Sequence, residues 1–216
     1  MSFWPMIAEL LSGLVVSVEI FVFTLLIALP LGLAVAFGRM SRNPAVTAVF
    51  RVYISVVRGT PLMLQILFVY FAPYFMFGMS LALYPRLLAT VLAFSLNYAA
   101  YFAEIYRGGI LSIDRGQAEA AVALGMSRST AFLRIILPQT VKRVIPAVGN
   151  EVITLVKDTS LAFTIAVTEM FTLAKQMSSA NTTMVPLVAA GVFYYVFNYL
   201  VATSMEYIEK RFDYYR

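Results

Sequence analysis

Polar and charged side chains recur at helical spacing within two apolar parts of the chain. Asn97, Tyr101 and Glu104 stand at positions i, i+4 and i+7, a spacing that places all three on one face of a helix. Glu151 and Asp158 share one face of a second helix in the same way. A charge at membrane depth costs roughly 2.5–3.5 kcal/mol on insertion scales, so such residues usually face a cavity or a partner. The spacing therefore predicts two polar stripes that line an interior path.

A path that carries charges of both signs suits a zwitterionic amino acid. The carboxylate of such a ligand needs a cation or N–H donors, and its ammonium group needs a carboxylate. The residues predicted to line the path are Asn97, Tyr101, Glu104, Glu151, Lys157 and Asp158.

The same residues also have a structural interpretation. Lys157 and Asp158 are sequence neighbours and do not face each other well on a regular helix, so each could pair with another helix and hold the fold together. The helix could also be broken near Thr159, as transporter helices often are at their sites. Glu104 could bond Arg107 at i+3 near the end of its helix, which makes it a weaker site candidate.

The composition predicts that membrane-spanning helices position these residues. Of 216 residues, 61% are hydrophobic and 12% are charged, whereas a soluble domain carries roughly 45–50% and about 25%. A spanning helix uses about 20 residues. We therefore expect an all-α, polytopic membrane protein, a single domain over 1–216 with about five transmembrane helices. These spans are predicted near 14–38, 60–82, 87–106, 144–167 and 184–206.

Basic residues predict the orientation of these spans. They gather between spans one and two, between spans three and four, and after span five, whereas the opposite side holds only Arg86 and Lys175. By the positive-inside rule, the N-terminus lies outside the cytoplasmic (inner) membrane and the C-terminus lies in the cytoplasm. The net charge of +5 is then mainly a topology signal, so membrane lipid is an expected partner and nucleic acid is not.

The residue inventory excludes several kinds of chemistry. The chain has no cysteine and no histidine, which rules out a Cys/His metal site and a Ser-His-Asp triad. It also lacks the glycine-rich P-loop that binds ATP. We expect no metal site and no catalytic residue.

The segment 107–143 is the longest polar interruption, and it predicts two short helices. Asp114 with Gln117 three residues later suits a helix N-cap with a capping-box partner. Gly125 fits the left-handed position after a helix, and Ser127 can cap the next helix. Pro138 is expected to end or kink that second helix.

Sequence motifs within and around this segment resemble those of a known family. Glu119-Ala120-Ala121, Gly125 and Ile135-x-Leu137-Pro138 match the EAA loop of ABC-importer permease subunits. Further motifs resemble the polar amino-acid uptake branch of that superfamily. They are Arg58-Gly59-Thr60-Pro61, Glu104 with Arg107-Gly108-Gly109, Gly116-Gln117, and Lys157-Asp158-Thr159-Ser160-Leu161. The resemblance runs from about residue 10 to the C-terminus.

The resemblance implies a permease that moves polar amino acids by alternating access. The first helix of the loop would be a coupling helix that docks into an ATPase subunit. The coupling residues would be Glu119, Ala120, Ala121, Gly125, Ile135, Leu137 and Pro138. The implied partners are two ABC ATPase subunits that bind ATP and magnesium, a second permease that is identical or paralogous, and an extracytoplasmic amino-acid-binding protein. This chain would bind no cofactor itself.

Two other function classes stay open on the residues alone. An ion-gradient-driven secondary transporter or channel could use the intramembrane charges to relay protons, although the chain is small and shows no inverted repeat. An intramembrane enzyme could use Glu151 and Asp158 as an acid pair, but histidine and cysteine are missing.

Overall fold

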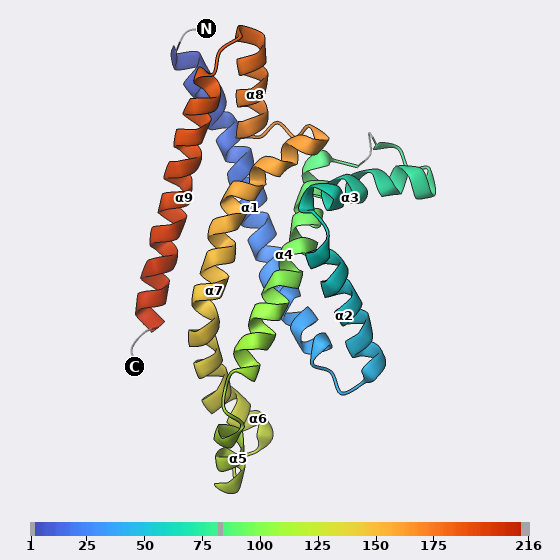
Figure 1. Cartoon of the computed structure of the whole chain (residues 1–216), viewed down its shortest axis with the longest axis vertical. Coiled ribbons are helices and arrows are strands. Elements are labelled where there is room, and N and C mark those ends of the chain that lie inside the picture. The colour runs from blue at the N-terminus through green and yellow to red at the C-terminus, as the bar shows by residue number, and fades with distance from the viewer. Residues whose placement is uncertain (1–2, 82–83, 213–216) are drawn as a thin grey trace.

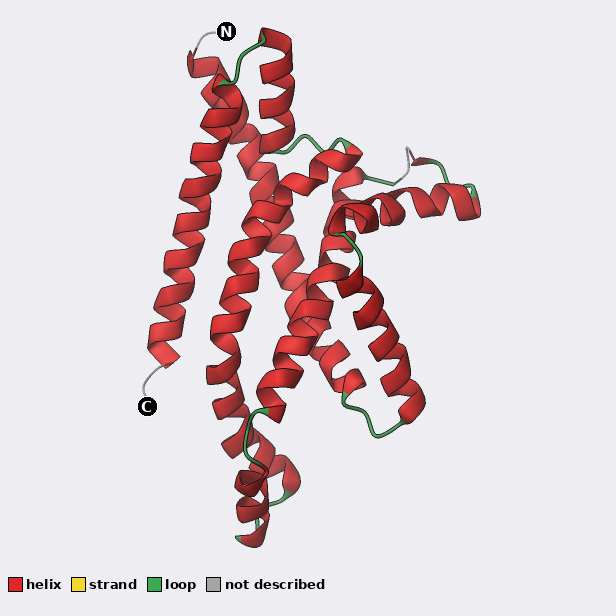
Figure 2. Cartoon of the chain, in the orientation of Figure 1, coloured by secondary structure: helices red, strands yellow, loops and turns green. Residues whose placement is uncertain are grey.

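The computed structural model describes residues 3–81 and 84–212, and every regular element within these ranges is helical (Figure 2). The helices, in chain order, are α1 (Phe3–Arg39), α2 (Pro44–Gly59), α3 (Leu62–Phe77), α4 (Arg86–Leu111), α5 (Arg115–Ala123), α6 (Arg128–Ala131), the π-helical turn η2 (Phe132–Ile136), α7 (Leu137–Asp158), the 3-10 segment η3 (Thr159–Ile165), α8 (Met170–Asn181) and α9 (Val185–Phe212). The expectation of an all-α polytopic membrane protein is confirmed.

Four long helices run beside one another along the longest axis of the molecule (Figure 1). α1 packs against α4, and α7 packs against both α4 and α9. The core between them is rich in aromatic side chains, and Phe94, Tyr98 and Phe102 of α4 are almost fully enclosed. α4 is thus the central helix, which explains why it can hold polar groups away from lipid.

Three of these helices are long and apolar enough to cross a membrane by themselves, namely α1, α4 and α9. α1 and α4 contain the predicted spans 14–38 and 87–106, and α9 covers the predicted span 184–206 except for its first residue. Each helix also extends beyond its predicted span at one end or both. α7 contains Lys142, Arg143, Glu151, Lys157 and Asp158. With these charges α7 is less apolar than α1, α4 and α9, so its crossing of the membrane stays a prediction.

The predicted second span, 60–82, contains α3, and a second helix that was not predicted, α2, precedes it. Two helices of 16 residues, α2 and α3, meet here at an angle of 113°. The pair reaches spanning length only when it is taken as one broken span. The break follows from Pro61, because the residue before a proline avoids helical geometry and Thr60 is extended with ψ 148°. The last predicted position, 82, lies outside the described residues.

The chain does not end its helix at Pro138, one of the two outcomes predicted for this proline. The helix that starts at Arg128 continues through η2 into α7, so α6 is the first turn of a longer rod. The Leu137 N–H bonds the Phe132 carbonyl five residues back, which is the widened bonding of a π-turn. The Gln139 side chain donates to the Ile135 carbonyl at 2.8 Å. We infer that the wider turn accommodates the missing N–H of Pro138.

A close helix crossing secures the other end of the fold. A Cβ built on Gly13 of α1 would lie 2.7 Å from the Met170 Cα of α8, so only glycine fits without movement of backbone. Gly191 of α9, in contrast, has nothing within 4 Å of its Cβ position.

We therefore expect Gly13→Ala to lower stability by about 1–3 kcal/mol, the usual cost of overpacking. Gly191→Ala is the matched control and should be neutral or slightly stabilising, because alanine favours a helix. Unfolding of the purified variants in detergent measures both. Equal stability of the two variants would show that α1 and α8 do not approach as described.

Candidate functional site

The polar residues of α4 and α7 meet at one hydrogen bond. The Tyr98 hydroxyl donates to Asp158 Oδ2 at 2.7 Å. Tyr98 is buried and Asp158 is half-buried, so the bond partly compensates the carboxylate for its loss of water. Sequence analysis included Asp158 but missed Tyr98, whose position in the apolar run of α4 gave no distinct signal.

Arg58, at the end of α2, brings a cation to the same place. Its guanidinium carbon lies 5.0 Å from the centre of the Tyr101 ring, which is within the range of a cation–π contact. It also exerts an electrostatic attraction on the Glu151 carboxylate. Sequence analysis treated Arg58 as a topology charge, and the signal that it does more is its place in the Arg58-Gly59-Thr60-Pro61 motif.

We name these five residues the polar cluster: Arg58, Tyr98, Tyr101, Glu151 and Asp158. Three helices supply it, and electrostatic interactions link its members across helix boundaries. Arg58 is exposed in this chain, and Tyr101, Glu151 and Asp158 are half-buried. Arg58 and the two carboxylates come from different helices, and together they offer a charged partner to each end of a zwitterion.

Asn97 is next to Tyr98 of the cluster, but its side chain is already hydrogen-bonded elsewhere. It is 5% exposed, and its Nδ2 donates to Gln65 Oε1 at 2.9 Å. Gln65 Nε2 in turn donates to the carbonyls of Val57 at 2.8 Å and Thr60 at 3.1 Å. These carbonyls lie at the end of α2, where helices leave acceptors without partners. Asn97 therefore holds the α2–α3 bend, a role that the spacing did not predict.

Two other predicted path residues lie apart from the cluster contacts. Glu104 pairs with Arg107 at 2.6 Å, the local bond that sequence analysis gave as its alternative role. Lys157 is exposed, and its charge acts on the carboxylate of its neighbour Asp158. Lys157 and Asp158 do not form an ion pair within α7. Asp158 instead accepts a hydrogen bond from Tyr98 of α4, which agrees with the structural interpretation.

The predicted coupling loop begins with a helix whose two ends are capped. The Asp114 side chain accepts a hydrogen bond from the Gly116 N–H at 2.6 Å. At the other end Gly125 has φ +84°, and the Met126 N–H bonds the Ala121 carbonyl at 3.1 Å. This bond pattern is the one that ends a helix at a left-handed glycine. Ser127 caps the next helix through the Thr130 N–H at 3.1 Å, as predicted.

The loop has a small apolar core and an exposed tip. Ala121 and Ile136 are buried within it, together with Ala131. The other predicted coupling residues are half-buried or exposed: Ile135 and Leu137 are half-buried, and Glu119, Ala120, Gly125 and Pro138 are exposed. Leu124 is 82% exposed, although sequence analysis did not select it. Val122 and Leu133 of the same loop are exposed too, at 47% and 59%. Several exposed apolar side chains in one loop are suited to a protein partner.

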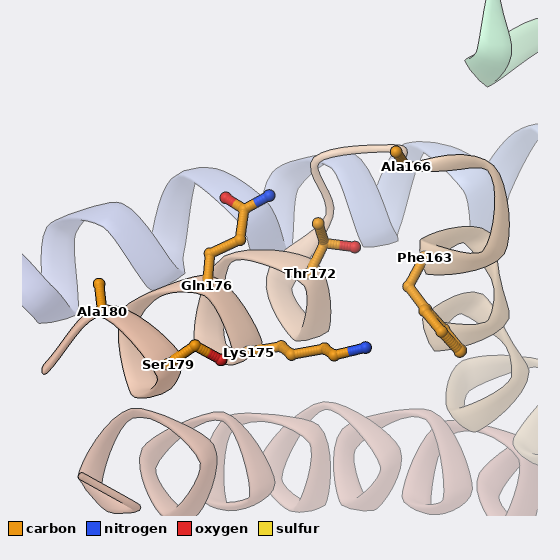
Figure 3. Close-up of a pocket in the computed structure, with 7 residues that line it drawn as sticks. All are labelled: Phe163, Ala166, Thr172, Lys175, Gln176, Ser179 and Ala180. Carbon is orange, nitrogen blue, oxygen red and sulfur yellow. The ribbon is translucent and has the colours of Figure 1, made fainter. Parts of the chain in front are cut away.

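The opposite end of the molecule carries a hollow of about 620 Å³ between η3 and α8 (Figure 3). Its lining residues are Phe163, Ala166, Thr172, Lys175, Gln176, Ser179 and Ala180. The Lys175 Nζ lies 5.1 Å from the centre of the Phe163 ring. The hollow shares no residue with the polar cluster.

Glu169 is a buried anchor of this end that sequence analysis missed. Its carboxylate accepts hydrogen bonds from the N–H groups of Phe171 and Thr172, both at 2.7 Å. The hydroxyls of Thr172 and Tyr194 donate to it at 2.9 Å. Burial raises the pKa of the Glu169 carboxyl, and these hydrogen bonds oppose that rise. Glu169 thus begins α8 and ties it to α9.

The Asn97–Gln65 bridge makes a testable claim about the α2–α3 bend. We expect Gln65→Met to lower stability by about 1–3 kcal/mol, because it leaves part-buried carbonyls and the Asn97 amide without a partner. Gln176→Met, on the exposed face of α8, is the matched control and should change stability by less than roughly 0.5 kcal/mol. Thermal unfolding in detergent measures both, and an equal effect of the two would remove Gln65 from the bend.

Comparisons with known proteins agree with this architecture. The chain matches the family described as "Binding-protein-dependent transport system inner membrane component" over residues 28–214. The L-cystine transport system permease protein TcyB of Bacillus subtilis is 37% identical over 216 residues, which cover 99% of this chain and 89% of that protein. The arginine transport system permease protein ArtQ of the same species is 36% identical over 208 residues, with 96% and 94% covered.

Solved structures show the same fold. A chain of "an amino acid ABC transporter with histidines" superposes with a TM-score of 0.88 at 32% identity, covering 98% of this chain and 99% of that one. A chain of the MetNI methionine ABC transporter, inward facing, has a TM-score of 0.78 at 18% identity, with 98% and 99% covered, which supports the fold alone.

These matches decide among the function classes that the residues left open. Neither an ion-gradient-driven transporter nor an intramembrane enzyme fits a chain matched to this family over most of its length. The chain belongs to the family of inner membrane components of binding-protein-dependent transport systems, and it is a multi-pass permease subunit of an ABC importer.

Proposed function

We propose that this permease carries polar amino acids across the cytoplasmic membrane by alternating access. The observation that carries the proposal is the polar cluster, in which α2 supplies the cation Arg58 and α7 supplies the carboxylates Glu151 and Asp158. An amino acid presents one carboxylate and one ammonium group, and the cluster offers a partner to each. The transport systems of the relatives named above handle cystine and arginine, which are substrates of this class.

Arg58 is the proposed partner of the substrate carboxylate, and the two acidic residues are the proposed partners of the ammonium group. Tyr101 would pack against the ligand beside Arg58. Asn97 would act indirectly, because its hydrogen bond to Gln65 stabilises the α2–α3 bend. Glu104 and Lys157 remain part of the proposed path, Glu104 toward the coupling end of α4 and Lys157 beside Asp158.

The proposed orientation places the N-terminus outside and the C-terminus in the cytoplasm. The connection between α1 and α2, the coupling loop and the C-terminal end of α9 all lie toward the lower end of the molecule (Figure 1). These are the regions where basic residues gather, as the positive-inside rule requires. With the α2–α3 pair and α7 each counted as one crossing, five crossings give this arrangement.

We further propose that the coupling loop, residues 107–143, binds an ATPase subunit. Its capped α5 and exposed Leu124 offer a rigid apolar contact at the end of the molecule. ATP and magnesium would be bound by that ATPase, and this chain would bind no cofactor. The complete importer would have two ATPase subunits, a second permease that is identical or paralogous, and an extracytoplasmic amino-acid-binding protein.

The proposed ATPase contact is tested at Leu124. We expect Leu124→Asp to reduce the amount of copurifying ATPase roughly tenfold or more, because a central apolar anchor of an interface is often worth over about 2 kcal/mol. Leu124→Met keeps the apolar contact and should retain the ATPase. Purification in mild detergent with quantitative mass spectrometry measures both. Full recovery of the ATPase with Leu124→Asp contradicts the proposed contact.

The proposed substrate site is tested at Arg58 and Asp158. Arg58→Gln and Asp158→Asn each remove one charge and keep a polar side chain of similar shape. We expect each to lower amino-acid uptake at subsaturating concentration by roughly tenfold or more, because the opposite charge of the ligand loses its partner. Uptake into vesicles that contain the reconstituted importer measures this effect.

The control for the substrate test is Arg42→Gln, on the exposed connection between α1 and α2. It loses the same charge away from the cluster, so uptake should stay within about twofold of the unchanged chain. If the cluster variants transport as well as this control, the amino-acid site lies elsewhere in the importer.

A further inference from the structure

The coupling loop connects α4 to α7, the two helices that meet at the Tyr98–Asp158 bond. A second junction joins the same helices at the opposite end, where the loop begins. This junction shares no residue with the polar cluster.

The first half of the junction is a close crossing of the two helices. A Cβ built on Gly109 of α4 would lie 2.2 Å from Val144 Cγ1 and 3.3 Å from Thr140 Cγ2 of α7. Val144 and Thr140 are both buried. The backbone of α4 at Gly109 therefore packs directly against these two side chains of α7, with no room for a side chain between the helices.

The second half is an arginine that caps α4. Arg143 Nη1 donates to the carbonyl oxygen of Ser112 and lies 3.0 Å from the Ser112 Oγ. Ser112 is the C-cap residue directly after α4, and its hydroxyl donates to the Gly109 carbonyl at 2.7 Å. Carbonyls at a helix C-terminus carry partial negative charge and lack helical partners, so they favour a guanidinium. We name this contact of Arg143 with Ser112 the arginine clamp.

The clamp lies directly before the helix that is proposed to meet the ATPase. α5 begins at Arg115, three residues after Ser112, and packs against α6 and η2. Because η2 continues into α7, α5 is already joined to α7 by packing. The arginine clamp and the Gly109 crossing join α4 to the same body.

We propose that Arg143 is a positioning residue for energy coupling, because its clamp on Ser112 makes α4 and α7 move as one body when α5 is displaced. Without the clamp, only the packing at Gly109 would join this end of α4 to α7, and part of the displacement of α5 would not reach α4 and the polar cluster. This inference rests on the proposed function, in which the loop binds an ATPase.

The first test uses the complete importer reconstituted in vesicles with its ATPase and binding protein. We expect Arg143→Met to keep the ATPase bound but to lower the number of amino acids transported per ATP roughly fivefold or more, the lower range of measured coupling between sites. Arg143→Lys, which can still donate to the carbonyl, should recover part of that ratio. Arg211→Met, at the end of α9, loses the same charge and should leave the ratio unchanged.

A second measurement leaves Arg143 in place and does not depend on the folding of a clamp variant. The chain has no cysteine, so Leu111→Cys and Asn150→Cys, both at exposed positions, can carry spin labels on α4 and α7. We expect the distance between these labels to be the same in the nucleotide-free and ATP-bound importer. A distance that changes with ATP, or an unchanged transport ratio in assembled Arg143→Met, overturns the proposal.

The failure of the proposed function has a different signature. If the unchanged chain binds no ATPase, the coupling loop has another role and the proposed function is wrong. If the ATPase binds and hydrolyses ATP normally while Arg143→Met transports with full efficiency, only the clamp is wrong.

Discussion

The structure depends on one physical constraint, which is that charged and polar groups on membrane-spanning helices cannot be left in contact with hydrocarbon. Here the constraint is met by α4, the most enclosed long helix. Its Tyr98 bonds Asp158, its Asn97 holds Gln65, and its Tyr101 ring lies beneath Arg58. Each contact reaches a different part of the chain, so the polar groups assemble the helices while the apolar faces remain free for lipid.

The same arrangement connects the two ends of the molecule. From Arg128 to Ile165 the chain is continuously helical, through the π-turn, α7 and the 3-10 segment. Its lower end packs with α5, and at its upper end the Ala166 carbonyl accepts a bond from Arg86 at 3.3 Å. A continuous helical rod can transmit a displacement over its whole length, because packed helices move as rigid bodies. The polar cluster lies beside this rod.

Local chemistry explains which sequence predictions were confirmed. Asp114, Gly125 and Ser127 were recognised as caps because the partners of a cap lie within a few residues along the chain. A helix start at residue 60 was predicted, but the helix α2 before it and the angle of 113° between the two helices were not. The direction of a helix depends on its packing partners, which an apolar run does not specify. Tyr98 was missed for a related reason: its partner Asp158 lies 60 positions away, and no local pattern records that distance.

The sequence by itself determined that this is an all-α membrane protein with a capped loop, because hydropathy, charge asymmetry and capping residues act locally. Its motifs also pointed to an ABC permease. Only the tertiary structure decided what each polar residue does. Although the Glu104–Arg107 pair is local to α4, the structure assigned Asn97 to the bend and Asp158 to Tyr98, and it brought Arg58 over the Tyr101 ring. The reason is that a polar group within a membrane is satisfied by whichever partner the packing of other helices places within reach.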